Sequence, residues 1–371
     1  MITNWCFTGR FINTGLLKPE VHKKSSADLK SGRRVGLIFA GLLLLVAIFI
    51  VLDVFFGSVT IKASDVIKAI FIGTDSTFET IILKFRLPKA ITALTVGAAL
   101  SLSGLQMQTV FRNPMAGPYV LGISSGASLG VAFVILGFSS NITPGSLNGF
   151  GNWILVAAAW AGAGAVMLLI MVISSRVKDI MTILILGIML SSGISAIVTI
   201  MQYFSNETML KAYVIWTMGS LGNLTANQLS VLLISVSAGL IISLFSSKML
   251  NALLLGENYA GSIGLNIRFA RVVIFTCTSI LAGSVTAFCG PIGFIGIAVP
   301  HIARILFKTS DHNVLIPGTI LTGGAVMLIS DIISQLPGSE SVLPVNAVTS
   351  LIGIPVVIWV ILRKRNYSGI V

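Results

Sequence analysis

Long apolar runs, separated by short polar connections or by Gly and Pro, dominate the chain from residue 35 to the end. The run Val35–Phe55 holds a single charged residue, Asp53, and a helix needs about 20 apolar residues to cross roughly 30 Å of hydrocarbon. The pattern therefore predicts an all-α, polytopic membrane protein with about ten transmembrane helices. The predicted spans lie near residues 35–55, 88–110, 119–137, 153–174, 180–204, 228–246, 270–288, 292–307, 314–335 and 344–362.

The composition agrees with a membrane-embedded chain. Of 371 residues 55% are hydrophobic and 10% are charged, whereas a soluble domain carries about 25% charged residues. The net charge of +12 is spread over the connections and does not form one basic face, so we expect no nucleic-acid partner. Three cysteines without CxxC spacing predict neither a disulfide framework nor a metal site.

The positions of Lys and Arg predict the orientation, since basic residues stay on the cytoplasmic side. Basic connections near 176–178, 248–271, 304–308 and 363–365 fall on the same side as the basic N-terminal tail, which places both termini in the cytoplasm. The stretch 57–88 is an exception, because it is basic and yet lies outside. We expect residues 1–34 to be a basic cytoplasmic tail and residues 35–371 to be the ten-span domain. The first apolar run lacks a small-residue cleavage site and is expected to be retained.

The spans contain the trace of an internal repeat. Spans two to five and spans seven to ten each open with a helix followed by a Gly-Pro break, Gly117-Pro118 and Gly290-Pro291. Because five spans separate the equivalent members, the second copy would be inverted, a design found in many transporters. Gly-Pro pairs are also common punctuation, and the many small residues inside the spans are explained by close helix packing.

Three motif stretches carry a family resemblance. Arg86-Leu87-Pro88-Lys89 is followed by the breaks Asn113-Pro114 and Gly117-Pro118, and non-helical backbone at membrane depth persists only where protein or a water-filled cavity covers it. Gly290–Arg304 and the last span, with Leu343-Pro344-Val345, add two further motifs. Together these stretches resemble the FecCD/cobalamin-type permeases of ABC importers, over the chain from about residue 35 to the end.

The resemblance implies a permease that moves an iron chelate (siderophore), haem or cobalamin into the cytoplasm by alternating access. It implies a second copy of the chain, two ATPase subunits at the cytoplasmic face and a soluble or lipid-anchored binding protein at the outer face of a bacterial cytoplasmic membrane. The sequence has no G-x-x-x-x-G-K-[ST] pattern to hold ATP phosphates. ATP and Mg are therefore expected on the ATPase, with no cofactor and no catalysis on this chain.

The resemblance also assigns residues to two contact surfaces. Docking of the binding protein is implied for Arg86, for Lys89 where the family has Arg, and for Gln335 where Arg is expected four residues after Asp331. Charge pairs steer docking, but Lys cannot reproduce the bidentate fork of Arg. Residues 250–266 are similar to the coupling helix that seats in the ATPase; a helix lying on lipid is the alternative. The coupling residues implied are Leu254, Gly256, Glu257, Ala260, Gly264 and Leu265.

The remaining implied positions are a translocation path and structural breaks. His301 could relay protons, because ionisable residues within a bilayer are costly, but near a helix end we interpret it as a structural group. The path residues implied are Met189, Ser191, Ser192 and Ser195. The structural motif residues are Asn113, Pro114, Gly117, Pro118, Gly290, Pro291, Pro300, His301 and Arg304.

Two other functions fit parts of the sequence. Gly122-Ile123-Ser124-Ser125-Gly126 satisfies G-x-S-x-G, with His301 as a base, but a serine hydrolase needs a strand-to-helix turn there. An ion-coupled carrier fits the broken spans, but Asp53 and Asp331 lie toward predicted span ends, which favours an external energy source. The sequence does not separate siderophore, haem and cobalamin, and residues 338–346 depart from the family pattern.

Overall fold

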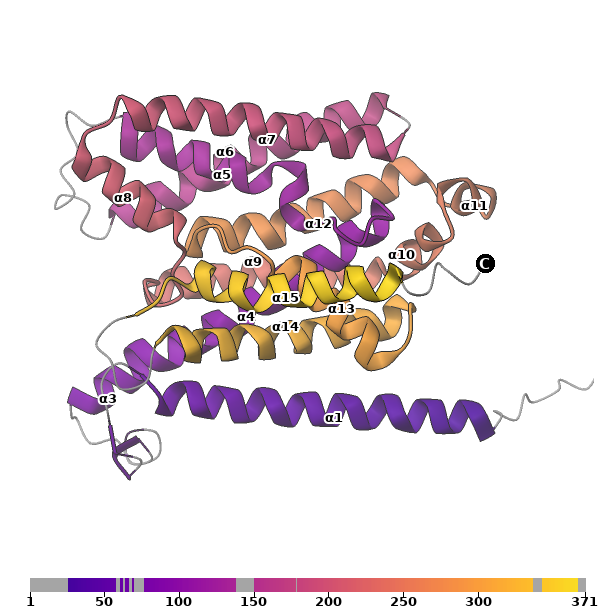
Figure 1. The fold of residues 1–371 in the computed structure, drawn as a ribbon, viewed down its shortest axis with the longest axis horizontal. Coiled ribbons are helices and arrows are strands. Elements are labelled where there is room, and N and C mark those ends of the chain that lie inside the picture. Colours follow the sequence, from indigo (N-terminus) through magenta and orange to yellow (C-terminus); the bar gives the residue numbers. More distant parts are fainter. Residues whose placement is uncertain are drawn as a thin grey trace, which may run out of the picture. The chain divides into compact units, whose positions relative to one another are not determined.

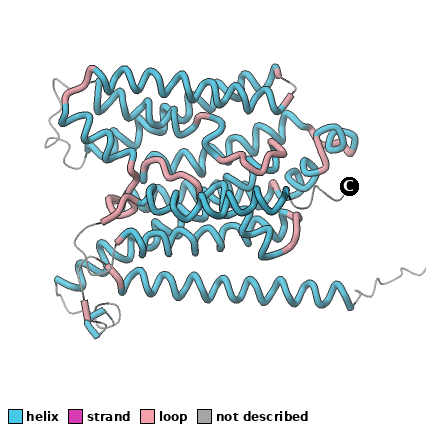
Figure 2. The backbone as a smooth tube through the Cα atoms, viewed as in Figure 1, coloured by secondary structure: helices cyan, strands magenta, loops and turns pink. Residues whose placement is uncertain are grey.

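The structure is a computed structural model, and it describes residues 26–57, 61–62, 64–66, 69, 77–137, 150–177, 179–335 and 342–365. In these ranges the chain is helical, with no strand (Figure 2). It forms two compact units, residues 1–37 and residues 38–371. In the first unit residues 26–37 are described, as the beginning of a helix; the rest of that helix and all later elements belong to the second unit.

Seven helices in the described part are long and apolar enough to cross a membrane, and three shorter apolar helices lie at 123–137, 295–307 and 345–360. These ten segments coincide with the ten predicted spans. The elements are α1 (Ser26–Phe55), α3 (Thr77–Ile81), η1 (Ile82–Arg86), α4 (Leu87–Val110), η2 (Pro118–Leu121), α5 (Ile123–Ala132), η3 (Phe133–Gly137), α6 (Phe150–Arg176), α7 (Ile180–Tyr203), α8 (Glu207–Thr217), α9 (Ala226–Phe245), α10 (Ser247–Leu254), α11 (Glu257–Ser262), α12 (Ile267–Cys289), α13 (Ile295–Phe307), α14 (His312–Ser334) and α15 (Val345–Arg365).

Two helices begin before the spans predicted for them. Residues 26–34, expected in the tail, are already helical in α1. The second span, expected from residue 88, continues a helix that starts at Thr77, through α3 and the π-helical turn η1. Pro88 has no N–H to donate and its ring crowds the preceding turn, which accounts for a wider π turn just before it rather than a chain break. The tail before residue 26 and the stretch 336–341 lie outside the described residues.

Helix starts follow capping chemistry, because the first N–H groups of a helix need acceptors. Thr225 and Gln228 form a reciprocal capping box at the start of α9, and Asp179 accepts from Met181 N and Thr182 N at the start of α7. Asn206, Asn266 and Asp311 cap α8, α12 and α14 in the same way.

Helices cross where glycines let the backbones touch. A Cβ placed on Gly97 of α4 would lie 2.2 Å from the carbonyl oxygen of Gly323 of α14, and one on Gly126 of α5 would lie 2.5 Å from the carbonyl oxygen of Gly162 of α6. In the bundle α4 packs on α14, and α12 packs on α6 (Figure 1). The predicted repeat makes span two (α4) equivalent to span seven (α12), and span four (α6) equivalent to span nine (α14). Under this equivalence the α4–α14 contact corresponds to the α12–α6 contact.

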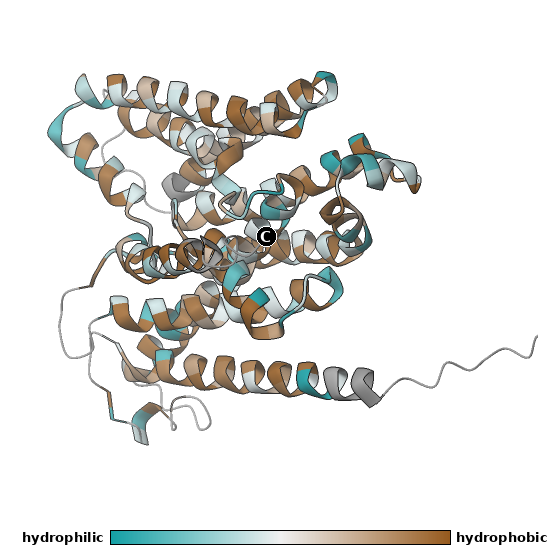
Figure 3. Ribbon diagram, turned by 45° about the vertical axis from the view of Figure 1, so that its right-hand side comes forward, coloured by the Kyte–Doolittle hydropathy of each residue, from teal (hydrophilic) through white to brown (hydrophobic). Residues whose placement is uncertain are grey.

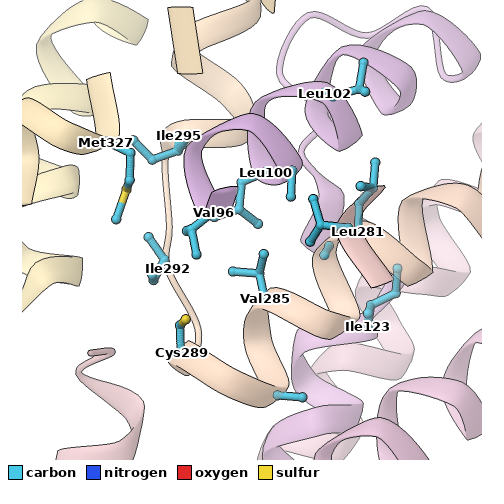
Figure 4. Close-up of a cluster of buried hydrophobic side chains, with 14 of the residues drawn as sticks. Val96, Leu100, Leu102, Ile123, Leu281, Val285, Cys289, Ile292, Ile295 and Met327 are labelled. Carbon is cyan, nitrogen blue, oxygen red and sulfur yellow. The ribbon is translucent and has the colours of Figure 1, made fainter. Parts of the chain in front are cut away.

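Helix α4 is the central element. Every residue from Thr95 to Val110 is buried, and Val96 and Leu100 meet Leu281 and Val285 of α12 in the core (Figure 4). By contrast, α7 lies at an edge of the bundle and exposes many apolar side chains (Figure 1). Apolar residues cover the long helices, and polar ones gather toward their ends (Figure 3).

Candidate functional site

Two polar regions lie at opposite ends of the bundle, and both contain residues that the sequence singled out. At the first, called the Lys89 end, α1 and α14 finish and α4 begins. At the second, called the α11 end, α4 finishes near the short helices α10 and α11 (Figure 1).

At the Lys89 end, two buried carboxylates from different helices share one amide. Gln335 Nε2, at the end of α14, donates to Asp53 Oδ1 of α1 at 2.9 Å and to Asp331 Oδ2 at 3.1 Å. Lys89 Nζ lies 3.0 Å from Asp331 Oδ1, with 18% of the Lys89 side chain exposed. Because a buried charge is costly unless paired, Lys89 is the counter-charge that Asp331 needs. Lys89 and Gln335 therefore compensate acids of their own chain.

Arg86 faces inward at the same end. Its Nη1 donates to the carbonyl oxygens of Val54 and Phe55, both at 2.9 Å, and the residue is only 7% exposed. These carbonyls belong to the last turn of α1, which has no intrahelical donors for them. A Cβ on Gly57 would lie 2.8 Å from the guanidinium, so a glycine leaves it room. Arg86 thus caps α1, and it is not the freely exposed arginine that a docking role would lead one to expect.

The three residues predicted for docking line one cleft of about 400 Å³. The same cleft is also lined by residues 219–223 and by Val342, Leu343 and Val345. The structure therefore brings these three residues together, although their polar groups are already engaged within the chain.

At the α11 end, glycines frame the predicted coupling segment. Gly256, at φ +108°, breaks the chain between α10 and α11, and Gly264, at φ +91°, follows α11. Both values lie in the region that glycine tolerates best. Ala260 is buried, and Leu265 N donates to the Ala260 carbonyl at 3.0 Å. Leu254, although within the motif, is only half-buried and ends α10.

This segment exposes three large apolar side chains. Leu255, Tyr259 and Ile263 are 63%, 51% and 58% exposed. Ile263, the residue after α11, is four residues from Tyr259 and donates its N–H to the Tyr259 carbonyl, so the two side chains lie on the same side. Leu255 lies just before the break that precedes this helix. The sequence prediction missed these three residues, because it selected the residues of the family motif and not the side chains that are exposed. Such a face is the usual anchor of a short helix in a partner's groove.

The sequence prediction also missed a set of side-chain hydrogen bonds at this end. His312 Nε2 lies 2.8 Å from Thr109 Oγ1 of α4, and His312 Nδ1 lies 2.8 Å from Asn251 Oδ1 of α10. Asn251 Nδ2 donates to Asp311 Oδ1 at 2.7 Å. The signal in the sequence was the Asp311-His312 pair, and its result is that α10 is bound to both α4 and α14.

The structural motif residues hold the break after α4 against α13. His301 Nε2 lies 2.8 Å from the carbonyl oxygen of Pro114, and Arg304 Nη1 donates to Gln108 Oε1 at 2.5 Å. Tyr119 donates its hydroxyl proton to the carbonyl oxygen of Ile292. This fits the structural interpretation of His301 and Arg304. The other motif residues form the breaks themselves: Asn113, Pro114, Gly117 and Pro118 before α5, Gly290 and Pro291 before α13, and Pro300 within α13.

The predicted path residues of α7 differ in their exposure. Met189, Ser192 and Ser195 are exposed. Ser191 is half-buried, its Oγ donates to the Gly187 carbonyl at 2.8 Å, and it lies against Gly122 of the preceding break. Ser191 lies one helical turn before Ser195 and so borders the exposed residues, but it is turned further toward the bundle.

The described residues give the hydrolase hypothesis no support. Ser124 lies in the first turn of α5 and follows no strand, since the described part of the chain contains none. Nor do these residues bring together three or more His, Cys, Asp or Glu side chains that could hold a metal ion.

Taken together, the helical breaks, the exposed coupling segment and the edge helix α7 define an integral-membrane transport permease. Residues 43–363 match the FecCD transport family, and the chain belongs to that family. It is 37% identical over 289 residues to the vitamin B12 import system permease protein BtuC of Escherichia coli O9:H4 (strain HS), an alignment that covers 78% of this chain and 85% of the relative.

Solved structures agree. A metal-chelate type ABC transporter in an inward-facing conformation superposes with a TM-score of 0.74 and 28% identity, covering 89% of this chain and 99% of the other. PsaBC from Streptococcus pneumoniae, in complex with Fab, gives a TM-score of 0.50 at 16% identity over 75% and 91% of the two chains, and shows the fold alone. The chain is thus the non-catalytic, multi-pass permease of a bacterial ABC importer, a class that works with ATPase and binding-protein partners. This excludes the hydrolase and the ion-coupled carrier.

Proposed function

We propose that this permease carries a large metal chelate, namely cobalamin, a ferric siderophore or haem, into the bacterial cytoplasm. The observation that supports this substrate class most directly is the 37% identity with the vitamin B12 permease, together with the likeness to a metal-chelate transporter. Both termini are assigned to the cytoplasm, in line with the basic connections, and the α11 end is then the cytoplasmic end.

The partners follow from the two ends. Two ATPase subunits bind the cytoplasmic face, one on the α11 segment of each of two copies of the chain, and carry the ATP and Mg. The exposed side chains of Leu255, Tyr259 and Ile263 support this role, since apolar side chains on a solvent-facing helix need a partner.

The path runs between the two copies along the exposed face of α7. Met189, Ser192 and Ser195 are exposed there, and two hydroxyl groups suit a water-filled passage better than lipid. Selectivity then rests mainly on the binding protein, which docks at the Lys89 end over the cleft that Arg86, Lys89 and Gln335 line.

Reconstitution tests the proposal. The permease, its ATPase and its binding protein in proteoliposomes are expected to accumulate one of three labelled probes, ⁵⁷Co-cobalamin, a ⁵⁵Fe-siderophore or ⁵⁵Fe-haem, only with Mg–ATP on the ATPase side. Full uptake without nucleotide, or no uptake of any of the three, would contradict it.

A further inference from the structure

Arg271, near the start of α12, joins three elements at the α11 end. Its Nε donates to Glu257 Oε1 at 2.9 Å and its Nη2 donates to Glu257 Oε2 at 2.7 Å. Its other terminal nitrogen, Nη1, donates to the carbonyl oxygen of Val177 at 3.1 Å. Glu257 is the first residue of α11, and Val177 follows the last residue of α6. One guanidinium thus ties the coupling helix to the turn between α6 and α7.

This ion pair has the geometry and burial of a stiff connection. The two parallel N–H···O contacts are the bidentate form, which is stronger and more directional than a single contact. The side chains are 5% exposed for Arg271 and 24% exposed for Glu257. Flexible, hydrated surface pairs contribute little, whereas a pair buried to this degree is strongly unfavourable to break.

The turn that Arg271 reaches leads directly into α7. Asp179 caps α7 by accepting from Thr182 N at 2.9 Å. Thr182 also contributes most to lowering the pKa of Asp179, through its hydroxyl, and the charge of Arg271 adds a smaller lowering. Asp179 is thus within electrostatic range of the same guanidinium.

The other side-chain hydrogen bonds of the coupling segment connect it to helices other than α7. Asn251 of α10 is held by His312, which links it to α14 and, through Thr109, to α4. Neither α4 nor α14 carries a predicted path residue. Of the side-chain contacts described for α10 and α11, the Glu257–Arg271 pair is the one directed toward α7.

We propose that Arg271 is the positioning residue that transmits displacement of α11 to the α6–α7 turn, and so to the path face of α7. The inference rests on the proposed function of α11 as the ATPase contact. When the ATPase moves α11, Glu257 moves the guanidinium, and the guanidinium moves the carbonyl that follows α6 together with the cap of α7.

Spin labels on the assembled complex with its ATPase test this without any substrate. Ser192→Cys on each copy reports α7, and Ser262→Cys on each copy reports α11. The native Cys277 and Cys289 are retained, because both are buried. The third native cysteine is removed by Cys6→Ala. Mg–ATP is expected to shift both inter-copy distances in the parent. In Arg271→Gln the Ser262 shift persists, while the equilibrium constant between shifted and unshifted Ser192 distances, taken from their populations with Mg–ATP, falls by about 5- to 150-fold, the usual range of a coupling factor.

Arg268→Gln is the matched control, because it removes the same charge from an exposed position one turn earlier on α12. It should behave as the parent. An Arg271→Gln complex with an intact Ser192 shift overturns the inference. If that variant does not assemble, Glu257→Gln decides, with a reduced Ser192 shift supporting and a full one overturning the inference. If Mg–ATP does not change the Ser262 distance in the parent, the ATPase role of α11 is refuted, and the inference is refuted with it.

Discussion

At the residue scale, the departures from the family pattern at positions 89 and 335 belong to one network. Lys replaces Arg at position 89, and an ammonium group pairs with one oxygen of Asp331 where a guanidinium would engage two. Gln replaces Arg at position 335, and its amide donates to both Asp53 and Asp331. Asp53 Oδ2 receives no hydrogen bond from the described residues. The end of the bundle that should meet an acidic partner therefore carries its own acids.

Asp331→Asn should destabilise the permease. The substitution leaves the Lys89 ammonium mostly buried and without its closest counter-charge, which is expected to cost about 3 kcal/mol in the free energy of unfolding. Denaturation in detergent, followed by tryptophan fluorescence, measures the change. The double variant Lys89→Met with Asp331→Asn should recover part of the loss; a single variant as stable as the parent would contradict the ion pair.

Arg86→Glu should act on α1 before it acts on docking. It removes two charge-assisted hydrogen bonds to the last carbonyls of α1 and puts a negative charge at the negative end of that helix, a loss of about 3 kcal/mol. A lower apparent melting temperature of the free permease, without any binding protein, checks this. Lys84→Glu, an exposed charge on the same turn, is the control and should leave the melting temperature unchanged. Equal melting of the two variants would contradict the capping role.

At the element scale, the sequence predicted where helices cross the membrane but not where they begin and end. Apolar composition marks membrane depth, and all ten runs coincide with apolar helices. The helical residues before Val35, where the first span was predicted to start, could not be assigned in that way, since α1 extends beyond its apolar part. Helix α8, within the expected loop 205–227, was missed for the same reason: it is a helix outside the long apolar runs.

The sequence predicted those residues of the candidate site that belong to a contiguous motif. Gly256 and Gly264 were found because they belong to the family motif of the coupling segment, and both lie at positive φ, where glycine is required locally. Leu255, Tyr259 and Ile263 were not, because exposure depends on what the rest of the chain covers. Likewise, Arg86 could be found by its motif, but its inward orientation depends on the end of α1, which lies 31 residues earlier.

Tyr259→Ala should weaken binding of the ATPase. Truncating an exposed aromatic anchor is expected to cost about 1–2 kcal/mol, or roughly a 5- to 30-fold higher Kd, with little change in the stability of the permease alone. Biolayer interferometry with the permease in nanodiscs measures this. Asn258→Ala, its exposed neighbour on α11, should stay within about twofold of the parent. Equal binding by Tyr259→Ala would argue against the apolar face as the contact.

At the scale of the whole molecule, the pairing of helices was beyond the sequence. Glycines and alanines occur in most spans, so small residues alone do not say that Gly97 meets Gly323 or that Gly126 meets Gly162. The Gly-Pro breaks indicated a repeat, and the exchange of the pairs α4–α14 and α12–α6 is what a repeat would produce. The partners themselves follow only from the three-dimensional packing.

Gly97→Ala tests this packing. The added methyl carbon would lie 2.2 Å from the Gly323 carbonyl oxygen, so the α4 and α14 backbones must separate, at about 2–3 kcal/mol. Gly164→Ala is the control, because nothing lies within 4 Å of its Cβ position. In an SDS titration, the Gly97→Ala variant should unfold at a lower SDS concentration than the Gly164→Ala variant. A Gly97 variant as stable as the control would mean that the two backbones are not in contact.

The burial of α4 has a consequence for biosynthesis. This segment is the least hydrophobic of the seven long apolar helices in the described part of the chain, and it carries Gln106 and Gln108 among its buried residues. Its partition from the translocon into lipid is therefore the least favourable. Helix α14, its main packing partner, begins about 200 residues later in the chain. The first half of the nascent permease must therefore hold a poorly partitioning helix until the second half is synthesised, and tertiary assembly in the membrane completes its insertion.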